Sequence, residues 1–184
     1  EDADSFEKLN EQISRLAYGD RSGKFVSYMA KTAECSIFDW WDANVVYEEK
    51  VLGHLNNRNA LFDARIQDET KRAAAHENLA ALKKELKKTA REMEESCRYL
   101  VSTLELTMDA IDIWNETGAR LCDIEYGKEK DEAACAALAG RLEAWFMKYK
   151  ASWRSISKEG DLHHIAEIVF WYADVLRGRR VYGK

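Results

Sequence analysis

The residues of this chain that could do chemistry are few, and its histidines come first because they serve as general bases and metal ligands. A di-metal site in a helical bundle needs a glutamate three residues before a histidine, so that both side chains leave one helix face. None of the histidines has that neighbour, and the zinc-protease pattern His-Glu-x-x-His is absent. We therefore predict no metal and no other cofactor. The histidines are His54, His76, His163 and His164.

Two further groups of residues could take part in acid–base chemistry, but their positions favour a structural role. His163 and His164 could supply a base or a pH switch, yet adjacent positions on a helix point about 100° apart, so they cannot share one site. We interpret one as an interface residue and the other as solvated. Asp68-Glu69 is interpreted as a solvated helix face rather than an acid–base pair. The sequence has no glycine-rich phosphate loop and no Gly-x-Ser-x-Gly elbow, so we predict no catalytic residue in this chain.

The cysteines are spaced too far apart for a Cys-x-x-Cys pair, and each falls among apolar neighbours on a predicted helix. This pattern favours buried free thiols over a disulfide framework. Free thiols in turn favour a cytoplasmic location. Asn115-Glu116-Thr117 matches a glycosylation sequon, but it lies inside a predicted helix and receives little weight. The cysteines are Cys35, Cys97, Cys122 and Cys135.

Aromatic residues are the one unusual feature, with 6 Trp, 8 Tyr and 6 Phe. They are densest at Trp40-Trp41 and at Phe170-Trp171-Tyr172. Most aromatics belong to a core by default. Adjacent residues on a helix cannot all face one way, so at least one in each cluster should point away from the core and mark a patch that meets another domain or subunit. The candidate interface residues are Trp153, Trp171 and Tyr172.

Long helices must position these side chains. Between Leu79 and Ile111, apolar residues recur every three or four positions, which keeps one stripe of a helix facing one way. At 1.5 Å per residue this stripe is roughly 48 Å long, and a helix of that length must be covered by others. The pattern predicts an all-α fold, an elongated antiparallel bundle of about five helices around one long central helix. Its residues are Leu79, Leu82, Leu86, Ala90, Met93, Cys97, Leu100, Leu104, Met108 and Ile111.

The other helices follow from the same periodicity and from capping residues. A first helix with one apolar face begins at Asp4 and stops near Tyr18, a second runs from about 24 to 56, and a third carries the long stripe and continues to Leu121. A fourth begins near Asp131, has an apolar face that includes Trp153 and Ile156, and is broken at Gly160-Asp161; a fifth shows apolar residues from Leu162 to Leu176 and ends at Gly178. Asp4, Asp131 and Asp161 are the predicted N-caps. Gly118, inside the third helix, predicts a kink or a close helix crossing.

Composition limits the class of protein. With 184 residues, 46% hydrophobic and 33% charged, the chain fits a globular domain with a sizeable core. Proline is absent, and the net charge of −5 with interspersed signs argues against a nucleic-acid partner. No apolar run is long enough for a membrane span. Because position 1 is Glu rather than Met, we expect residues 1–184 to be a single helical domain that is part of a larger chain.

The segment from Tyr149 to Leu162, YKASWRSISKEGDL, continues through Ile165 to FWYADVLR, which ends at Arg177. It resembles the C-terminal helical region of bacterial family-20 glycoside hydrolases, the β-N-acetylhexosaminidases. There a helix ends in a Tyr…Trp-Arg segment, a short break follows, and a last helix closes the domain. The segment ESCR at 95–98 is similar to a helix that precedes it. The resemblance covers about the second half of the chain and rests on packing residues.

The resemblance implies a non-catalytic accessory domain of a carbohydrate-active enzyme. The family's reaction uses an Asp-Glu pair at the end of a strand in a (β/α)8 barrel, and no barrel is predicted here. We therefore expect this chain to pack against the catalytic barrel of its parent, support an active-site wall or mediate dimerisation. Two alternatives remain: a free-standing helical protein–protein interaction module, and a metal or small-ligand bundle enzyme. They differ in the reading frame upstream of Glu1 and in whether purified protein carries a ligand.

Overall fold

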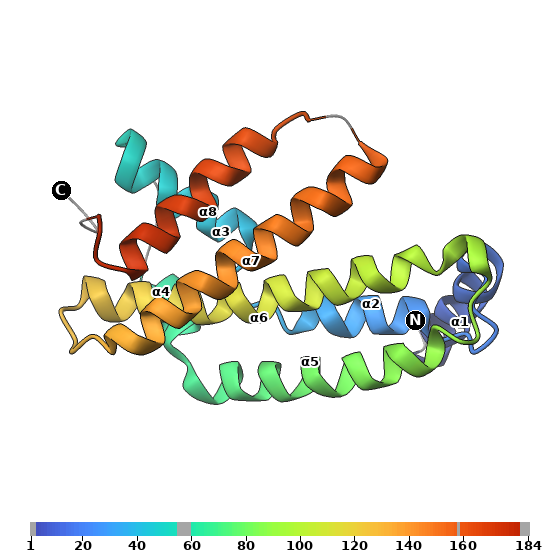
Figure 1. The fold of residues 1–184 in the computed structure, drawn as a ribbon. Coiled ribbons are helices and arrows are strands. Elements are labelled where there is room, and N and C mark those ends of the chain that lie inside the picture. The colour runs from blue at the N-terminus through green and yellow to red at the C-terminus, as the bar shows by residue number, and fades with distance from the viewer. Residues whose placement is uncertain (1–2, 55–59, 158, 181–184) are drawn as a thin grey trace. The chain divides into compact units, whose positions relative to one another are not determined.

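The computed structural model describes residues 3–54, 60–157 and 159–180. Within them the backbone forms helices and no β-strand, which confirms the predicted all-α fold (Figure 1). Backbone contacts divide the chain into two compact units: unit 1 comprises Glu1–Ser36 and Ala73–Met108, and unit 2 comprises Ile37–Arg72 and Asp109–Lys184. The helices are α1 (Ala3–Tyr18), α2 (Phe25–Glu34), α3 (Trp40–Tyr47), a π-helical turn η1 (Glu48–Leu52), α4 (Ala60–Gln67), α5 (Glu69–Thr89), a 3₁₀ turn η2 (Glu95–Cys97), α6 (Tyr99–Glu125), α7 (Glu132–Ile156) and α8 (Leu162–Leu176).

The predicted central helix is wrong as a single rod, because the stripe from Leu79 to Ile111 is divided between α5 and α6. The interruption has a tertiary cause. The amide of Glu94 donates to the carbonyl of Gly19 at 3.0 Å, and the amide of Arg21 donates to the carbonyl of Glu92 at 3.1 Å. Hydrogen bonds to a distant loop thus replace the helical ones, and α5 and the start of α6 run antiparallel in unit 1 (Figure 1).

The predicted second helix is also divided, into α2, α3 and the η1 turn. At the first break the side-chain oxygen of Asn115 accepts hydrogen bonds from the backbone amides of Ile37 and Phe38, at 2.8 and 3.0 Å. Asp39 then opens α3 through a capping box with Asp42. Since these amides are satisfied by a residue far away in the sequence, periodicity along the helix could not reveal the break.

The turn between α1 and α2 is built on the buried carboxylate of Asp20, whose residue is 0% exposed. Its oxygens accept from the amide and hydroxyl of Ser22, at 2.9 and 2.7 Å, and from the amides of Lys24 and Phe25, at 2.7 and 2.9 Å. These last two amides lie at the start of α2, where no helical acceptor exists. Asp20 therefore holds the corner of unit 1. The predicted cap at Asp4 is wrong, because α1 is already helical at Ala3.

Replacing Asp20 with Ala tests this corner. The substitution leaves several buried donors without an acceptor, so we expect a loss of about 3 kcal/mol of unfolding free energy in urea titrations. The matched control is Asp131→Ala, which removes an exposed cap whose carboxylate accepts from the amide of Ala134 at 2.9 Å. An exposed N-cap contributes about 1 kcal/mol, so equal losses in the two variants would contradict the account of Asp20.

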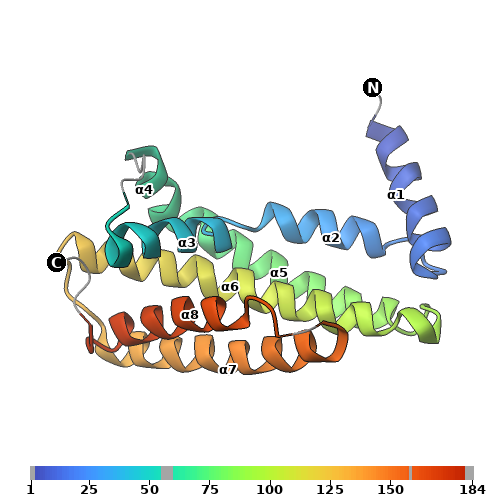
Figure 2. The ribbon, with the colours of Figure 1, turned by 90° about the horizontal axis from the view of Figure 1, so that it is seen from above.

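Unit 2 is held by aromatic packing between α3, α6, α7 and α8, and α7 and α8 run antiparallel and side by side (Figures 1 and 2). The predicted cap at Asp131 is confirmed. Asp161 occupies the N-cap position of α8, but its side chain makes no capping hydrogen bond. Gly118 lies on α6, where an added Cβ would meet the Cγ of Phe38 at 2.5 Å. Gly118 thus marks a close approach of α6 to the α2–α3 connection, and not the predicted crossing of two helices.

A pair of glycine substitutions measures this approach. Gly118→Ala forces the ring of Phe38 to shift inside a packed core, and we expect it to destabilise the protein by about 1–3 kcal/mol. The control is Gly140→Ala in α7, where an added Cβ would meet nothing within 4 Å. There the higher helix propensity of alanine is expected to stabilise the chain by up to about 1 kcal/mol. Urea unfolding should show opposite signs for the two variants, and the same sign in both would contradict the close packing at Gly118.

Candidate functional site

Two of the three predicted interface residues lie in the core of unit 2. Tyr172 is 0% exposed, and its hydroxyl donates to the backbone carbonyl of Ala43 at 2.8 Å. Trp171 is 5% exposed, and its ring meets Tyr47 edge-on, with centroids 5.6 Å apart. The prediction that Trp171 and Tyr172 form an exposed interface is therefore wrong. Both faces of α8 that carry these side chains are covered, and the two side chains pack α8 against α3.

The third predicted residue, Trp153, is half-buried and belongs to an aromatic stripe on α7. The ring of Trp145 stacks on Tyr149 at 5.3 Å, and Tyr149 meets Trp153 at 5.9 Å. The spacing of four residues places these rings on one helix face, and Ile156 continues it by three. Exposure rises from 8% at Trp145 to 71% at Ile156. We name Trp145, Tyr149, Trp153 and Ile156 the α7 stripe.

The α7 stripe begins next to the aromatic core of unit 2, and its side chains become more exposed toward the C-terminal end of α7. Trp114, which is 3% exposed, meets Trp145 edge-on at 6.4 Å and Tyr172 at 5.3 Å. Burial of the next ring in the stripe raises the pKa of the Tyr149 hydroxyl above its ordinary value, so this residue stays neutral. The outer half of the stripe is thus an uncharged, rigidly supported surface. It suits contact with another protein surface better than acid–base chemistry.

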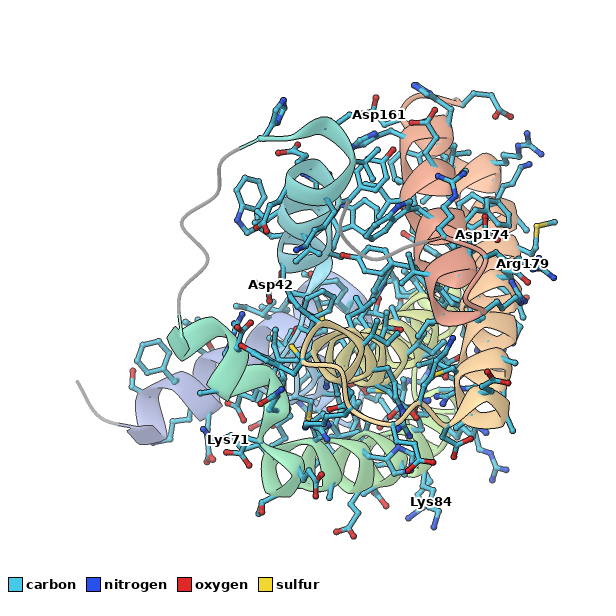
Figure 3. All side chains as sticks on the ribbon, turned by 90° about the vertical axis from the view of Figure 1, so that its left-hand side faces the viewer. Asp42, Lys71, Lys84, Asp161, Asp174 and Arg179 are labelled. Atoms are coloured by element: carbon cyan, nitrogen blue, oxygen red, sulfur yellow. The ribbon has the colours of Figure 1, made fainter. Side chains whose placement is uncertain are left out.

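A hollow of about 460 Å³ lies beside α8, within the size range of small-ligand sites. Its charged groups are the carboxylate of Glu167 and the guanidinium of Arg180, and Phe170 is its most exposed ring, at 42%. Asp174 lies 3.4 Å from Arg180 and 3.8 Å from Arg179, and Figure 3 shows Asp174 beside Arg179. The hollow is thus bordered by mutually neutralising charges. The remaining lining residues are Tyr47, Ala166 and Trp171.

The other residues that the sequence marked as possible catalytic groups make contacts that indicate structural roles. His164 is half-buried, with its Nε2 3.2 Å from the side-chain oxygen of Asn44, and His163 is exposed. This confirms the interpretation of one interface and one solvated histidine. Asp68 accepts from the amide of Lys71 at 3.0 Å at the start of α5. Asn115 is 4% exposed and engaged with the α2–α3 connection, so its sequon lies inside the core.

Among the residues that the structure describes, the cysteine thiols have surroundings that favour a structural role. Cys35, Cys122 and Cys135 are buried free thiols, as predicted, whereas Cys97 is only partly buried. Burial is the main cause that raises the pKa of the Cys35 and Cys135 thiols, which keeps them protonated.

No group of three or more His, Cys, Asp or Glu side chains in the described ranges could hold a metal ion. None of the described helices is both long and apolar enough to cross a membrane.

Comparisons with protein-family models, curated proteins and solved structures gave no match to this chain. A function for this chain is therefore inferred from the arrangement of its own residues. Ile156 belongs to the apolar face predicted for the fourth helix, yet it is 71% exposed. The available signal was its position near the end of that helix, four residues before the predicted break at Gly160. Trp41, in the other predicted aromatic cluster, is 72% exposed on α3.

An ion pair that joins α7 to α8 gives a pH-dependent test of this part of unit 2. Arg177 donates to both carboxylate oxygens of Glu143, one at 2.7 Å, and these hydrogen bonds lower the pKa of Glu143. A lowered carboxyl pKa stabilises the fold above the unfolded value of about 4.3, and the contribution disappears as the pH falls through the folded value. We expect Arg177→Met to lower the Tm by about 1–3 °C at pH 7 and by less near pH 3.

The control for this ion pair is Arg154→Met, which removes the partner of Glu159 on an exposed part of α7. Exposed pairs contribute little because water screens them, so its Tm should hardly change. An equal loss in both variants, or an Arg177→Met effect that does not decrease in acid, would contradict the role of Glu143 in joining α7 to α8.

Proposed function

We propose that this chain is a non-catalytic helical accessory domain of a carbohydrate-active enzyme related to β-N-acetylhexosaminidases. The observation that supports it most is that the outer part of the α7 stripe, from Tyr149 to Ile156, lies in the segment whose sequence resembles the C-terminal region of that family. Its outer rings Tyr149 and Trp153 are half-buried and Ile156 is exposed. Large apolar side chains at the end of a supported stripe are typical of a surface that another domain covers.

The partner that this proposal names is the catalytic barrel of the same parent chain. The half-exposed rings are uncharged, and each packs on its neighbour along α7, Tyr149 on Trp145 and Trp153 on Tyr149, so they lose little conformational freedom when a partner covers them. Rigid aromatic anchors of this kind carry a large share of binding energy in interfaces. The domain would support a wall of the active site through this contact, or mediate dimerisation of the enzyme, and catalysis would reside in the barrel.

The first test uses the chain alone and its reading frame. We expect purified protein to fold, as judged by far-UV circular dichroism, and to release no nitrophenol from a nitrophenyl N-acetylglucosaminide. The reading frame upstream of Glu1 is expected to encode a (β/α)8 barrel. Turnover by the pure chain would overturn the non-catalytic assignment, and a start codon close to Glu1 with no barrel would overturn the accessory-domain assignment.

The second test places Ile156→Asp in the full-length enzyme. A carboxylate in a covered apolar contact should lower the Tm of the full enzyme by several degrees, whereas the isolated chain should keep its Tm because Ile156 is exposed there. The control is Lys148→Asp, an exposed position of α7 outside the stripe. If both variants behave alike in the full enzyme, the α7 stripe is not the docking surface.

A free-standing helical interaction module is the second candidate. It is favoured by the amount of apolar surface exposed in unit 1, where Leu16 of α1 is 87% exposed and Phe6 is 58% exposed. A helix with this pattern can bind another helix without any catalytic domain. The upstream reading frame separates the two candidates, since a module of this kind needs no barrel.

A further inference from the structure

Helix α1 carries an apolar seam that the rest of unit 1 leaves exposed. Phe6, Leu9, Ile13 and Leu16 are 58%, 48%, 37% and 87% exposed. Their spacing of three, four and three residues is that of the a and d positions in two successive heptads. A seam of this spacing is matched by one partner helix that crosses at a shallow angle, and not by a broad flat surface. We name these four residues the α1 seam.

The opposite face of α1 is fixed to unit 1. The hydroxyl of Ser14, a residue that is 0% exposed, accepts from the amide of Val26 at 3.0 Å, and the ring of Tyr18 lies 5.3 Å from that of Phe25. Figure 2 shows α1 reaching away from α2 toward the N-terminus. Because α1 is anchored at its C-terminal end, the entropic cost of forming the helix is already met before any partner binds.

The positions that flank the seam carry no charge. The e positions are Asn10 and Ala17, and the g positions that border the seam are Gln12 and, just before the first heptad, Ser5. In coiled coils these positions decide which partner is accepted, usually through charges. A seam with neutral flanks meets no like-charge repulsion when it is paired with its own copy.

The seam is also self-complementary in the antiparallel direction. When two copies of α1 are paired about a two-fold axis at Glu11, Phe6 of one lies level with Leu16 of the other, and Leu9 lies level with Ile13. Each level then pairs two large apolar side chains and leaves none unmatched. This symmetry follows from the order of the four residues alone.

The helix dipoles favour antiparallel neighbours, which sets the same direction. The charged residues Glu7 and Arg15 lie at b and c positions, away from the seam, and Arg15 is paired with Glu11 of its own helix at 2.9 Å. We propose that α1 is a homodimerisation element in which the α1 seams of two copies of this chain pair antiparallel. The proposal specifies a surface for dimerisation, and it needs no catalytic parent.

The size of the seam sets the strength of this dimer. Four side chains of this kind expose on the order of 400 Å² per copy, so a pair buries about 800 Å², which is below the roughly 1,200–2,000 Å² of stable interfaces and is typical of weak association. Sedimentation velocity on the full 184-residue chain, from about 1 µM to about 1 mM, covers the range expected for such weak association. We expect a reversible monomer–dimer equilibrium.

Substitutions in the seam test which surface forms the dimer. Leu9→Glu and Ile13→Glu place carboxylates against apolar partners, and each should weaken dimerisation at least about 10-fold. Lys8→Glu adds the same side chain to α1 outside the seam, and Ile156→Glu alters an exposed apolar residue of the α7 stripe instead. Both controls should dimerise as the native chain does. All four positions are exposed, and circular dichroism confirms that each variant is folded; Leu9→Ser replaces Leu9→Glu if the latter is not.

Cross-linking tests the direction. In a Cys97→Ser background the remaining cysteines are buried. A mixture of the Phe6→Cys and Leu16→Cys chains should form disulfide heterodimers, while each chain alone should form few homodimers. A native chain that stays monomeric at every concentration, a dimer that persists in both seam variants, or homodimers that outnumber heterodimers would overturn the proposal. Loss of dimer in Ile156→Glu alone would assign association to the α7 stripe and overturn the α1 seam while leaving the accessory-domain proposal intact.

Discussion

A buried backbone amide must have an acceptor, and this constraint decides where the helices of this protein end. At the start of α2 the acceptor is the carboxylate of Asp20, and at the start of the α2–α3 connection it is the side-chain oxygen of Asn115. Between α5 and α6 it is the carbonyl of Gly19, which receives the amide of Glu94. At the α2–α3 connection and between α5 and α6 the acceptor comes from far along the sequence, whereas Asp20 lies in the turn that adjoins α2.

The same constraint explains what the sequence could predict. Apolar periodicity identified the all-α class and the courses of α7 and α8, because both properties depend on residues three and four apart. It joined α5 to α6 wrongly, since the apolar spacing continues through Met93 while the backbone there pairs with the loop at Asp20. Apolar periodicity indicates which face of a helix a residue would occupy. It carries no information about a distant hydrogen-bond acceptor that can replace the helical carbonyl and end the helix.

The candidate surfaces were predicted only in part, for a related reason. Tyr172 and Trp171 looked exposed because adjacent aromatics cannot share one helix face, but α8 packs on two sides and buries both. Trp153, the third predicted interface residue, is half-buried, and the stripe extends from it to Ile156 at the end of the same helix. An aromatic cluster therefore indicates burial or exposure only after the number of packed faces of its helix is known.

The two exposed apolar surfaces differ in a way that points to different partners. Exposure along the α7 stripe rises from 8% to 71%, so a partner would extend a core that already begins at Trp114. A broad domain surface can do this because stacked rings offer a continuous face. The α1 seam has separate large side chains, 37% to 87% exposed, with heptad spacing, and a second helix fills the gaps between them.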